Sequence, residues 1–428
     1  MHNSKYKCTY LLRQQTPLIH FQYRQPHAAL RASEVKPMLD RFMQNFIKKH
    51  NLKIPKDWYI DIPEGNSFAK PFNYKMSIKT DAEPETVQSN NLYFGKMGHK
   101  VSPAEALIFK CKNSDGTIIN GVKLEILCFL ETKAEISESL KGCGLADKFS
   151  LNELIGFILP AFFALTCFGT RATKGFGSFN VDGEKLSEAY IHLFVPVFYK
   201  IPYMAVQGHK EIMDDIWVIS GLMKSGFNFG KGSYYKGRAL IYLRETQNKK
   251  IGADKAFIKK KVLTNGEDRN RNSEDCYEYD EFRFVRAMLG LPQDYTYRKS
   301  VNTTREGKVS ISPAKGNSVE RFASPVRFVP NGKELYIVPD EIPAEMFNAE
   351  FKFKSERASS EIKTPSDSEF NLIEYLDWFM NAFNTKTNLK NGEFTENDRM
   401  RISKTVTRTI AKNLTIRKCS GKAGDSNA

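Results

Sequence analysis

The chain has 428 residues, with 64 Lys and Arg against 49 Asp and Glu, and therefore a formal net charge of +15. Its length suits two or three domains of roughly 100–200 residues each, and its 41% hydrophobic content excludes wholesale disorder. The seven cysteines form no Cys-x-x-Cys pair and the N-terminus has no signal-like apolar run, so we expect a reduced, cytoplasmic protein without a zinc site. The positive charge makes a polyanion the first candidate partner, with RNA or DNA favoured over a membrane.

The first third of the chain predicts a strand and then a helix. Residues 6–21 carry two β-type runs on either side of a polar step. From Pro37 onward, apolar residues recur at helical spacing and polar residues take the other face, the apolar set being Leu39, Phe42, Met43, Phe46 and Ile47. Residues 121–132 then predict a second strand.

An apolar run at 154–168 predicts a second helix, buried on most sides. The run is shorter than the roughly 20 residues that span a membrane. It opens after a capping-box spacing, Ser150 and Glu153, and stops at Gly169. A strand at 178–181 follows, so the element order is β, α, strands, α, β, which is typical of a ferredoxin-like unit.

A weaker set of the same kind follows. Residues 190–204 look strand-rich, 211–224 and 371–383 look helical, and Asn331-Gly332 predicts a hairpin. We therefore expect an α+β protein with two tandem ferredoxin-like (RRM-like, βαββαβ) domains, at 1–187 and 188–394. A basic insertion at about 248–273 and a basic C-terminal extension at 395–428, with its last ten residues disordered, complete the prediction. Either basic segment can also be a plain solvated face.

The segment 168–179, Phe-Gly-Thr-Arg-Ala-Thr-Lys-Gly-Phe-Gly-Ser-Phe, carries the clearest chemistry. Its glycines allow positive φ and close approach of backbone N–H groups to a ligand. Arg171 and Lys174 supply charge for phosphate oxygens, and Phe176 or Phe179 can stack on a base or pack below the loop. A dinucleotide site would need the strand before the glycines and the helix after them, and no P-loop sequence occurs. A tight helix-to-strand turn with incidental charges gives the same spacing.

This loop resembles the glycine-rich loop of the RAMP superfamily, the repeat-associated mysterious proteins of CRISPR systems. Two more segments are similar to the family: Thr16-Pro17-Leu18 after the first strand, and the Arg-x-x-Ser-Pro segment from Arg321 to Pro325. Residues 31–42 occupy the family's entry to the first helix, with Lys36-Pro37 in place of Lys-Gly. The chain looks most like the first-numbered RAMP subunit of the Cmr (type III-B) complex.

The resemblance implies a non-catalytic RNA-binding subunit of a cytoplasmic type III CRISPR effector complex. Its partners would be crRNA, target RNA and other RAMP and effector subunits, with no membrane, metal or cofactor. We expect phosphate contacts from the loop, stacking by Phe176 and added charge or hydrogen bonds near the first helix; the RNA-binding set is Arg171, Lys174, Gly175, Phe176, Gly177, Ser178, Arg31, Ser33, Lys36 and Arg24. A plain helix start with a solvated lysine remains the alternative for Ser33 and Lys36.

Catalysis is the rival hypothesis. Metal-independent RNA cleavage needs a general base near the 2′-OH and a cation for the developing charge, and His20 and His27 flank Arg24. Histidines beside basic residues also suit RNA contact without chemistry. The pair Asp214-Asp215 fits a solvated helix face or cap better than a metal site.

Overall fold

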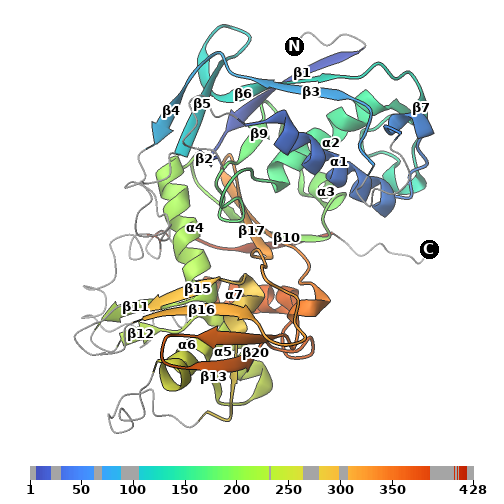
Figure 1. Ribbon diagram of the computed structural model, residues 1–428. Helices are drawn as coiled ribbons and strands as arrows, with labels where there is room; N and C mark the ends of the chain where they lie inside the picture. Colours follow the sequence, from blue (N-terminus) through green and yellow to red (C-terminus); the bar gives the residue numbers. More distant parts are fainter. Residues whose placement is uncertain are drawn as a thin grey trace. The chain divides into compact units, whose positions relative to one another are not determined.

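The computed structural model describes residues 6–20, 30–61, 70–87, 106–230, 233–263, 279–297, 307–385, 409, 412 and 414–421. The chain divides into two units: unit 1 is Met1–Asp214, Phe328–Val338 and Cys419–Ala428, and unit 2 is Asp215–Arg327 and Pro339–Lys418. Both units mix helices with antiparallel strands (Figure 1). The expected α+β class is therefore confirmed at this level.

Unit 1 is built on a seven-stranded sheet. Its main path runs β2-β5-β6-β1-β9, where the strands are Leu18–Ile19, Ala106–Lys112, Ile118–Leu127, Lys7–Gln14 and Phe179–Val181. Strand β3 (Lys75–Lys79) also pairs with β6, and β4 (Ala82–Val87) pairs with β5. The strand β1 pairs antiparallel with both of its neighbours, Leu12 lying opposite Val122 and Val181. The alternation of side chains along β1 turns Leu12 inward, where it is fully buried.

Helix α1 (Ala32–Lys49) covers this sheet with the predicted apolar face. Leu39, Met43, Phe46 and Ile47 are buried, and Val35 extends the stripe by one turn. The helix begins at Ala32, which agrees with the expected helix start at Ser33 and Lys36. Pro37 lies inside the helix, where it has no N–H to donate to the carbonyl four residues earlier.

Helix α2 (Leu151–Leu165) confirms the second prediction. Ser150 Oγ accepts from the Glu153 N–H at 3.3 Å, and Glu153 Oε2 accepts from the Ser150 N–H at 2.6 Å, which completes the capping box. The helix is buried on most sides, as expected. The predicted stop at Gly169 is wrong by four residues, because the helix ends at Leu165 and Thr166 already has extended backbone. No helix in the described part of the chain is long and apolar enough to cross a membrane.

A second sheet has the order β17-β18-β10-β21, with strands Val326–Asn331, Glu334–Pro339, Val197–Pro202 and Arg417–Ser420. The hairpin at Asn331-Gly332 is confirmed. The expected strand from Tyr190 is wrong at its start, because Ser187 caps a short helix, α3 (Glu188–His192), by accepting from the Tyr190 N–H. Phe198, Val329 and Tyr336 of this sheet form one buried cluster with Ala164 and Leu165 of α2.

Two further short strands complete unit 1. They are β7 (Lys133–Glu135) and β8 (Lys148–Ser150), which pair antiparallel just before α2.

Unit 2 contains a four-stranded sheet that the sequence did not predict. Its order is β15-β16-β19-β20, with strands Asp294–Tyr297, Gly307–Pro313, Glu350–Lys354 and Ser359–Lys363. Two small strand pairs accompany it: β11 (Phe227–Gly230) with β12 (Ser233–Tyr235), and β13 (Ile251–Ala253) with β14 (Glu281–Arg283).

The helices of the second half agree with the two that were predicted. Helix α4 (His209–Lys224) starts in unit 1 and continues into unit 2, and α7 (Leu372–Thr385) buries the expected Leu372, Tyr375, Leu376, Phe379 and Phe383. Helix α5 (Arg238–Gln247) and α6 (Asp254–Phe257) were not predicted.

The predicted basic insertion at 248–273 is in part a folded element. Helix α6 passes into a π-helical turn (Ile258–Val262), and Phe257, Ile258, Val262 and Leu263 are buried in the core of unit 2. These apolar residues flank the run Lys259-Lys260-Lys261, so a prediction made from the charge of the segment missed them. Residues 264–278 lie outside the described part of the chain, as do Arg269 and Arg271.

The C-terminal extension is also partly folded. Strand β21 adds Arg417–Ser420 to the second sheet, and Leu414, Ile416 and Cys419 are buried. The expected disorder of the last ten residues therefore does not hold for Cys419 and Ser420, whereas residues 422–428 lie outside the described part.

The close pairing of β1 and β6 generates a stability prediction. A Cβ at Gly121 would lie 2.0 Å from the Leu12 carbonyl oxygen, so Gly121→Ala must force the two strands apart. We expect the free energy of unfolding, measured by chemical denaturation, to fall by about 3 kcal/mol. The matched control is Gly116→Ala in the turn between β5 and β6, where a Cβ meets nothing within 4 Å and only a positive φ opposes the change. This control should cost about 1 kcal/mol. Equal effects of the two variants would contradict the prediction.

Candidate nucleic-acid interface

The glycine-rich loop, residues 169–178, joins α2 to β9 in unit 1. Its two ends are held together at the base, where Cys167 and Ser178 form a β-bridge and the Phe168 N–H donates to the Gly177 carbonyl at 3.0 Å. Inside the loop, the Lys174 N–H donates to the Arg171 carbonyl at 2.8 Å. The loop is therefore a closed, internally bonded turn.

The glycines at the two ends are required by close approach. Gly169 and Gly177 have φ values of +75° and +68°. A Cβ at Gly169 would lie 2.6 Å from the Ile19 carbonyl oxygen, and one at Gly177 would lie 2.2 Å from the Phe168 carbonyl oxygen. Only glycine fits both the conformation and the space.

The segment Thr16-Pro17-Leu18 holds the second half of the loop. Thr16 is fully buried, and its Oγ1 donates to the Gly175 carbonyl at 2.5 Å and accepts from the Ser178 N–H at 3.0 Å. The Gly177 N–H donates to the Pro17 carbonyl at 2.8 Å. The sequence singled out this segment but gave no sign that its hydroxyl bonds the loop directly.

Strand β17 supports the other side of the loop. The Phe328 N–H donates to the Thr173 carbonyl at 3.2 Å, and Ser178 Oγ donates to the Pro330 carbonyl at 2.6 Å. The Lys174 ammonium lies over the Phe328 ring, 5.7 Å from its centroid. Phe328 follows the Arg-x-x-Ser-Pro segment by three residues, and it is a contact residue that sequence reasoning missed.

Arg171 and Lys174 are the cations of the loop, and both are half-buried. Burial, with the positive charge of Arg171 as a second cause, lowers the pKa of Lys174 to about 8. Among the described residues, no carboxylate forms an ion pair with Lys174 that would offset this cost. Arg171 has a φ of +64°, a left-handed conformation that is unfavourable for a residue with a side chain. An anion placed beside Lys174 would offset the cost of burying its charge.

The start of α1 reaches the loop through one contact. The Gly169 N–H donates to Glu34 Oε1 at 2.8 Å, which brings the first turn of the helix to the first residue of the loop. Arg31 and Ser33 are exposed at this helix start. The first turn of α1 and the start of the loop therefore lie next to each other.

Lys36 is placed differently from the prediction. Its ammonium pairs with Asp40 Oδ2 at 2.8 Å, donates to the Phe72 carbonyl at 2.9 Å and lies over the Tyr74 ring. Asp40 is 5% exposed and needs this cation. Lys36 therefore has a structural role here, and the i, i+4 spacing of Lys36 and Asp40 was the signal that could have shown it.

Some of the other residues predicted to contact RNA are buried, and others lie outside the described part of the chain. Phe176 and Phe179 are 2% and 0% exposed, so both rings pack below the loop and neither presents a face for stacking. Ser178 is also fully buried, and Gly175 accepts from Thr16. Arg24 and His27 lie outside the described residues.

His20 is 3% exposed. Burial and the nearby Arg31 lower its pKa, against an opposing effect of Glu34. A buried imidazole cannot reach the 2′-OH of a strand on the surface, so this conformation gives His20 no access to substrate. In the described part of the chain, no group of three or more His, Cys, Asp or Glu residues is arranged to hold a metal ion.

The acidic pair Asp214-Asp215 is not a solvated face. Asp214 is 8% exposed and pairs with Lys210 at 3.2 Å, while Asp215 is fully buried. Asp215 accepts from Lys412 Nζ at 2.6 Å and Thr409 Oγ1 at 2.7 Å. The sequence could not show the contacts of Asp215, because Thr409 and Lys412 lie 194 and 197 positions away in the chain.

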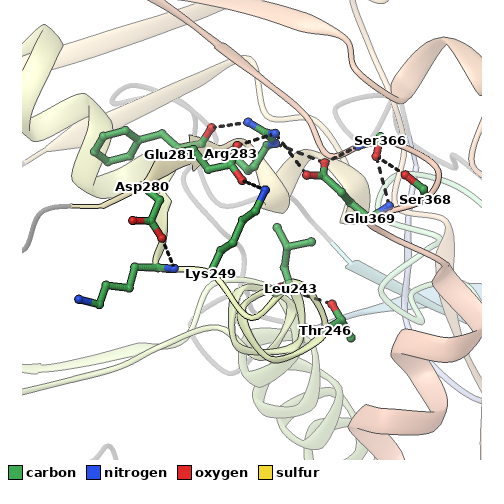
Figure 2. Close-up of polar contacts among 11 residues, drawn as sticks. Leu243, Thr246, Lys249, Asp280, Glu281, Arg283, Ser366, Ser368 and Glu369 are labelled. Atoms are coloured by element: carbon green, nitrogen blue, oxygen red, sulfur yellow. Dashed lines mark hydrogen bonds and ion pairs between the residues drawn. The ribbon is translucent and has the colours of Figure 1, made fainter.

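A second group of charges lies in unit 2, where Arg283 and Lys249 pair with Glu281 and Glu369 (Figure 2). Arg283 donates to both oxygens of Glu369, at 3.3 and 3.2 Å, and pairs with Glu281 at 2.7 Å. The Ser366 N–H donates to Glu369 Oε2 at 2.8 Å, so the group fastens the turn at 366–369 to β14. Burial alone would raise the pKa of Glu369, but the bonds from Arg283 and Ser366 outweigh it and lower the pKa. This cluster offers no unbalanced cation for a polyanion.

Comparisons with known proteins give the family of the chain. Two family models match the chain: the Cmr1 N-terminal domain over residues 5–227 and the Cmr1 C-terminal domain over residues 234–405. Among solved structures, the chain is similar to Cmr1 from Pyrococcus furiosus in its apo form, with 10% sequence identity and a TM-score of 0.33; 98% of this chain and 99% of that chain are covered. No curated protein matches the chain. Because the family models cover more than half of the sequence, the chain belongs to the Cmr1 family, whose members are subunits of the type III-B CRISPR complex.

Proposed function

We propose that this protein is a non-catalytic RNA-binding subunit of a cytoplasmic type III-B CRISPR complex, and that it holds crRNA or the crRNA–target duplex in antiviral defence. The proposal rests chiefly on the charge of the glycine-rich loop. Lys174 is half-buried beside Arg171 at a cost to its charged form, and no carboxylate of the described residues forms an ion pair with it. A phosphate would remove that cost and complete the site.

The loop supplies positioning as well as charge. Its backbone is fastened by Thr16 and Phe328, so Arg171 and Lys174 are presented on a support that needs little ordering on binding. Arg31, exposed at the start of α1, can extend the contact. Phe176 is omitted from this proposal because its ring is buried.

We further propose that both halves are ferredoxin-like. In the first half, the antiparallel order β5-β6-β1-β9, with α1 after β1 and α2 before β9, supports this topology. In the second half, the order β17-β18-β10-β21, with α4 after β10 and α7 before β21 in the chain, supports it in the same way.

The conformation of Arg171 allows function to be separated from stability. Arg171→Gly removes the cation and relieves the left-handed strain, so the free energy of unfolding should stay the same or rise by up to about 1 kcal/mol. RNA affinity should nevertheless fall. The slope of log K against log salt on single-stranded RNA should flatten by about 0.7, one phosphate contact. Adding Lys174→Ala should flatten it by the same amount again. An unchanged slope for the folded double variant would exclude the loop as the RNA contact.

The pKa of Lys174 gives a pH test. Between pH 7 and 9 the ammonium of a lysine with a pKa of about 8 loses its proton, so RNA affinity should fall by about three- to tenfold. Fold stability should change in the opposite direction. The folded pKa lies below the ordinary 10.5, so the unfolded chain binds more protons between these values and stability rises with pH.

The control for this test is Lys174→Arg, because arginine stays charged throughout the range. Fluorescence anisotropy with poly(A) RNA at constant salt measures the affinity, since adenine does not lose a proton at these pH values. The wild type should weaken as pH rises and the variant should not. Equal pH profiles would refute the assignment of the effect to Lys174.

A further inference from the structure

Glu34 is an acidic residue in the middle of a proposed phosphate-binding region, and its role is not explained by charge. We propose that Glu34 is a positioning residue, whose side chain holds the start of the glycine-rich loop in its RNA-binding form by accepting the Gly169 N–H. It acts through the loop and does not touch RNA. This inference rests on the proposed function.

The start of the loop needs such a support. Helix α2 ends at Leu165, so the N–H of Gly169 receives no helical partner. Gly169 is in the left-handed region and so is Arg171, two residues later. An arginine in this conformation is strained and relaxes unless neighbouring bonds hold it.

Different bonds hold the different parts of the loop. The second half is fastened by Thr16 and Pro17 and the middle by Phe328. At the start, the Thr170 N–H donates to the Ile19 carbonyl at 2.8 Å, and the Gly169 N–H donates to Glu34 at 2.8 Å. The acceptor of the Thr170 N–H is a backbone carbonyl, whereas the acceptor of the Gly169 N–H is the Glu34 side chain of α1. The packing of α1 against the core therefore fixes the position of this acceptor.

The surroundings favour a carboxylate at this place. Glu34 lies in the first turn of α1, where the helix dipole stabilises negative charge. Arg31, the exposed N-cap residue of the same helix, and the buried His20 lie close by, since both Arg31 and Glu34 act on the pKa of His20. The protein itself therefore provides surroundings that accept a carboxylate at Glu34.

A competing interpretation makes Glu34 a stand-in for phosphate that RNA displaces. The geometry argues against it, because the Gly169 N–H is directed to Glu34 of α1, and the Gly169 Cα lies so close to Leu18 and Ile19 that a Cβ there would meet them. Lys174 has a different neighbour, Phe328 of β17. The Gly169 N–H and the Lys174 ammonium, which is the proposed phosphate contact, therefore lie in different surroundings within the loop.

Two comparisons of full-length proteins, each at constant charge, separate the positioning role of Glu34 from an effect of its charge. Glu34→Ala and Glu34→Gln both remove the charge, but only glutamine keeps an acceptor that reaches Gly169. Glu34→Asp and the wild type both keep the charge, but aspartate is one methylene too short. We expect Glu34→Ala to bind poly(A) RNA about three- to tenfold more weakly than Glu34→Gln, and Glu34→Asp to bind more weakly than the wild type.

Glu135 provides a matched control. It is an exposed carboxylate of β7 in unit 1, and it pairs with Lys148 of β8 at 3.3 Å. Glu135→Ala and Glu135→Gln should bind RNA equally. Hydrogen exchange of the peptide that contains residues 168–178 gives a second readout, since it should accelerate in Glu34→Ala and Glu34→Asp but not in Glu34→Gln.

The outcomes separate this inference from the function on which it rests. If the wild type binds RNA and Glu34→Ala binds as tightly as Glu34→Gln, or more tightly, the positioning role is refuted and the proposed function stands. If the wild type binds no RNA, both fail. Should Glu34→Ala not fold, the comparison of Glu34→Asp with the wild type decides the question, and equal affinities overturn the inference.

Discussion

The close approach of the glycine-rich loop to the end of β1 is the constraint on which the proposed RNA site depends. The buried Thr16 hydroxyl bonds both Gly175 and Ser178, and neither end of the loop leaves room for a Cβ. The loop cannot move away from the sheet without leaving these polar groups unpaired, which costs more than the bonds themselves contribute. The left-handed Arg171 and the half-buried Lys174 persist because the backbone around them is fixed elsewhere.

The sequence predicted the parts of the fold that have local signals. The apolar stripe of α1, the capping box of α2 and the Asn331-Gly332 hairpin each depend on residues within a few positions of one another. It did not predict the unit 2 sheet β15-β16-β19-β20, where lysines, serines and glutamates alternate with the buried residues of short strands. Such strands resemble polar loops when they are read without their partners.

The candidate site was predicted in outline, and its internal contacts were not. The sequence located Arg171 and Lys174 from their spacing between glycines. It assigned Lys36 to a phosphate, although the nearby buried Asp40 takes that charge. The contacts of Glu34 with Gly169 and of Phe328 with Lys174 join residues more than 130 positions apart, so no local pattern carries them. Pairings of this kind come from tertiary packing and override the tendency of each residue alone.

The distribution of paired charge explains why the loop is a better candidate than the strands beside it. On β1, β3 and β6, Lys7 and Lys79 both bind Glu125 and lower its pKa to about 2, while Lys123 pairs with Asp81. Cations that already have carboxylates must give them up before they can bind phosphate, and the exchange gains little. Within the described part of the chain, Lys174 forms no ion pair with a carboxylate, and burial already disfavours its charged form. An anion that binds Lys174 therefore displaces no carboxylate, which is the physical basis for proposing an RNA contact at the loop.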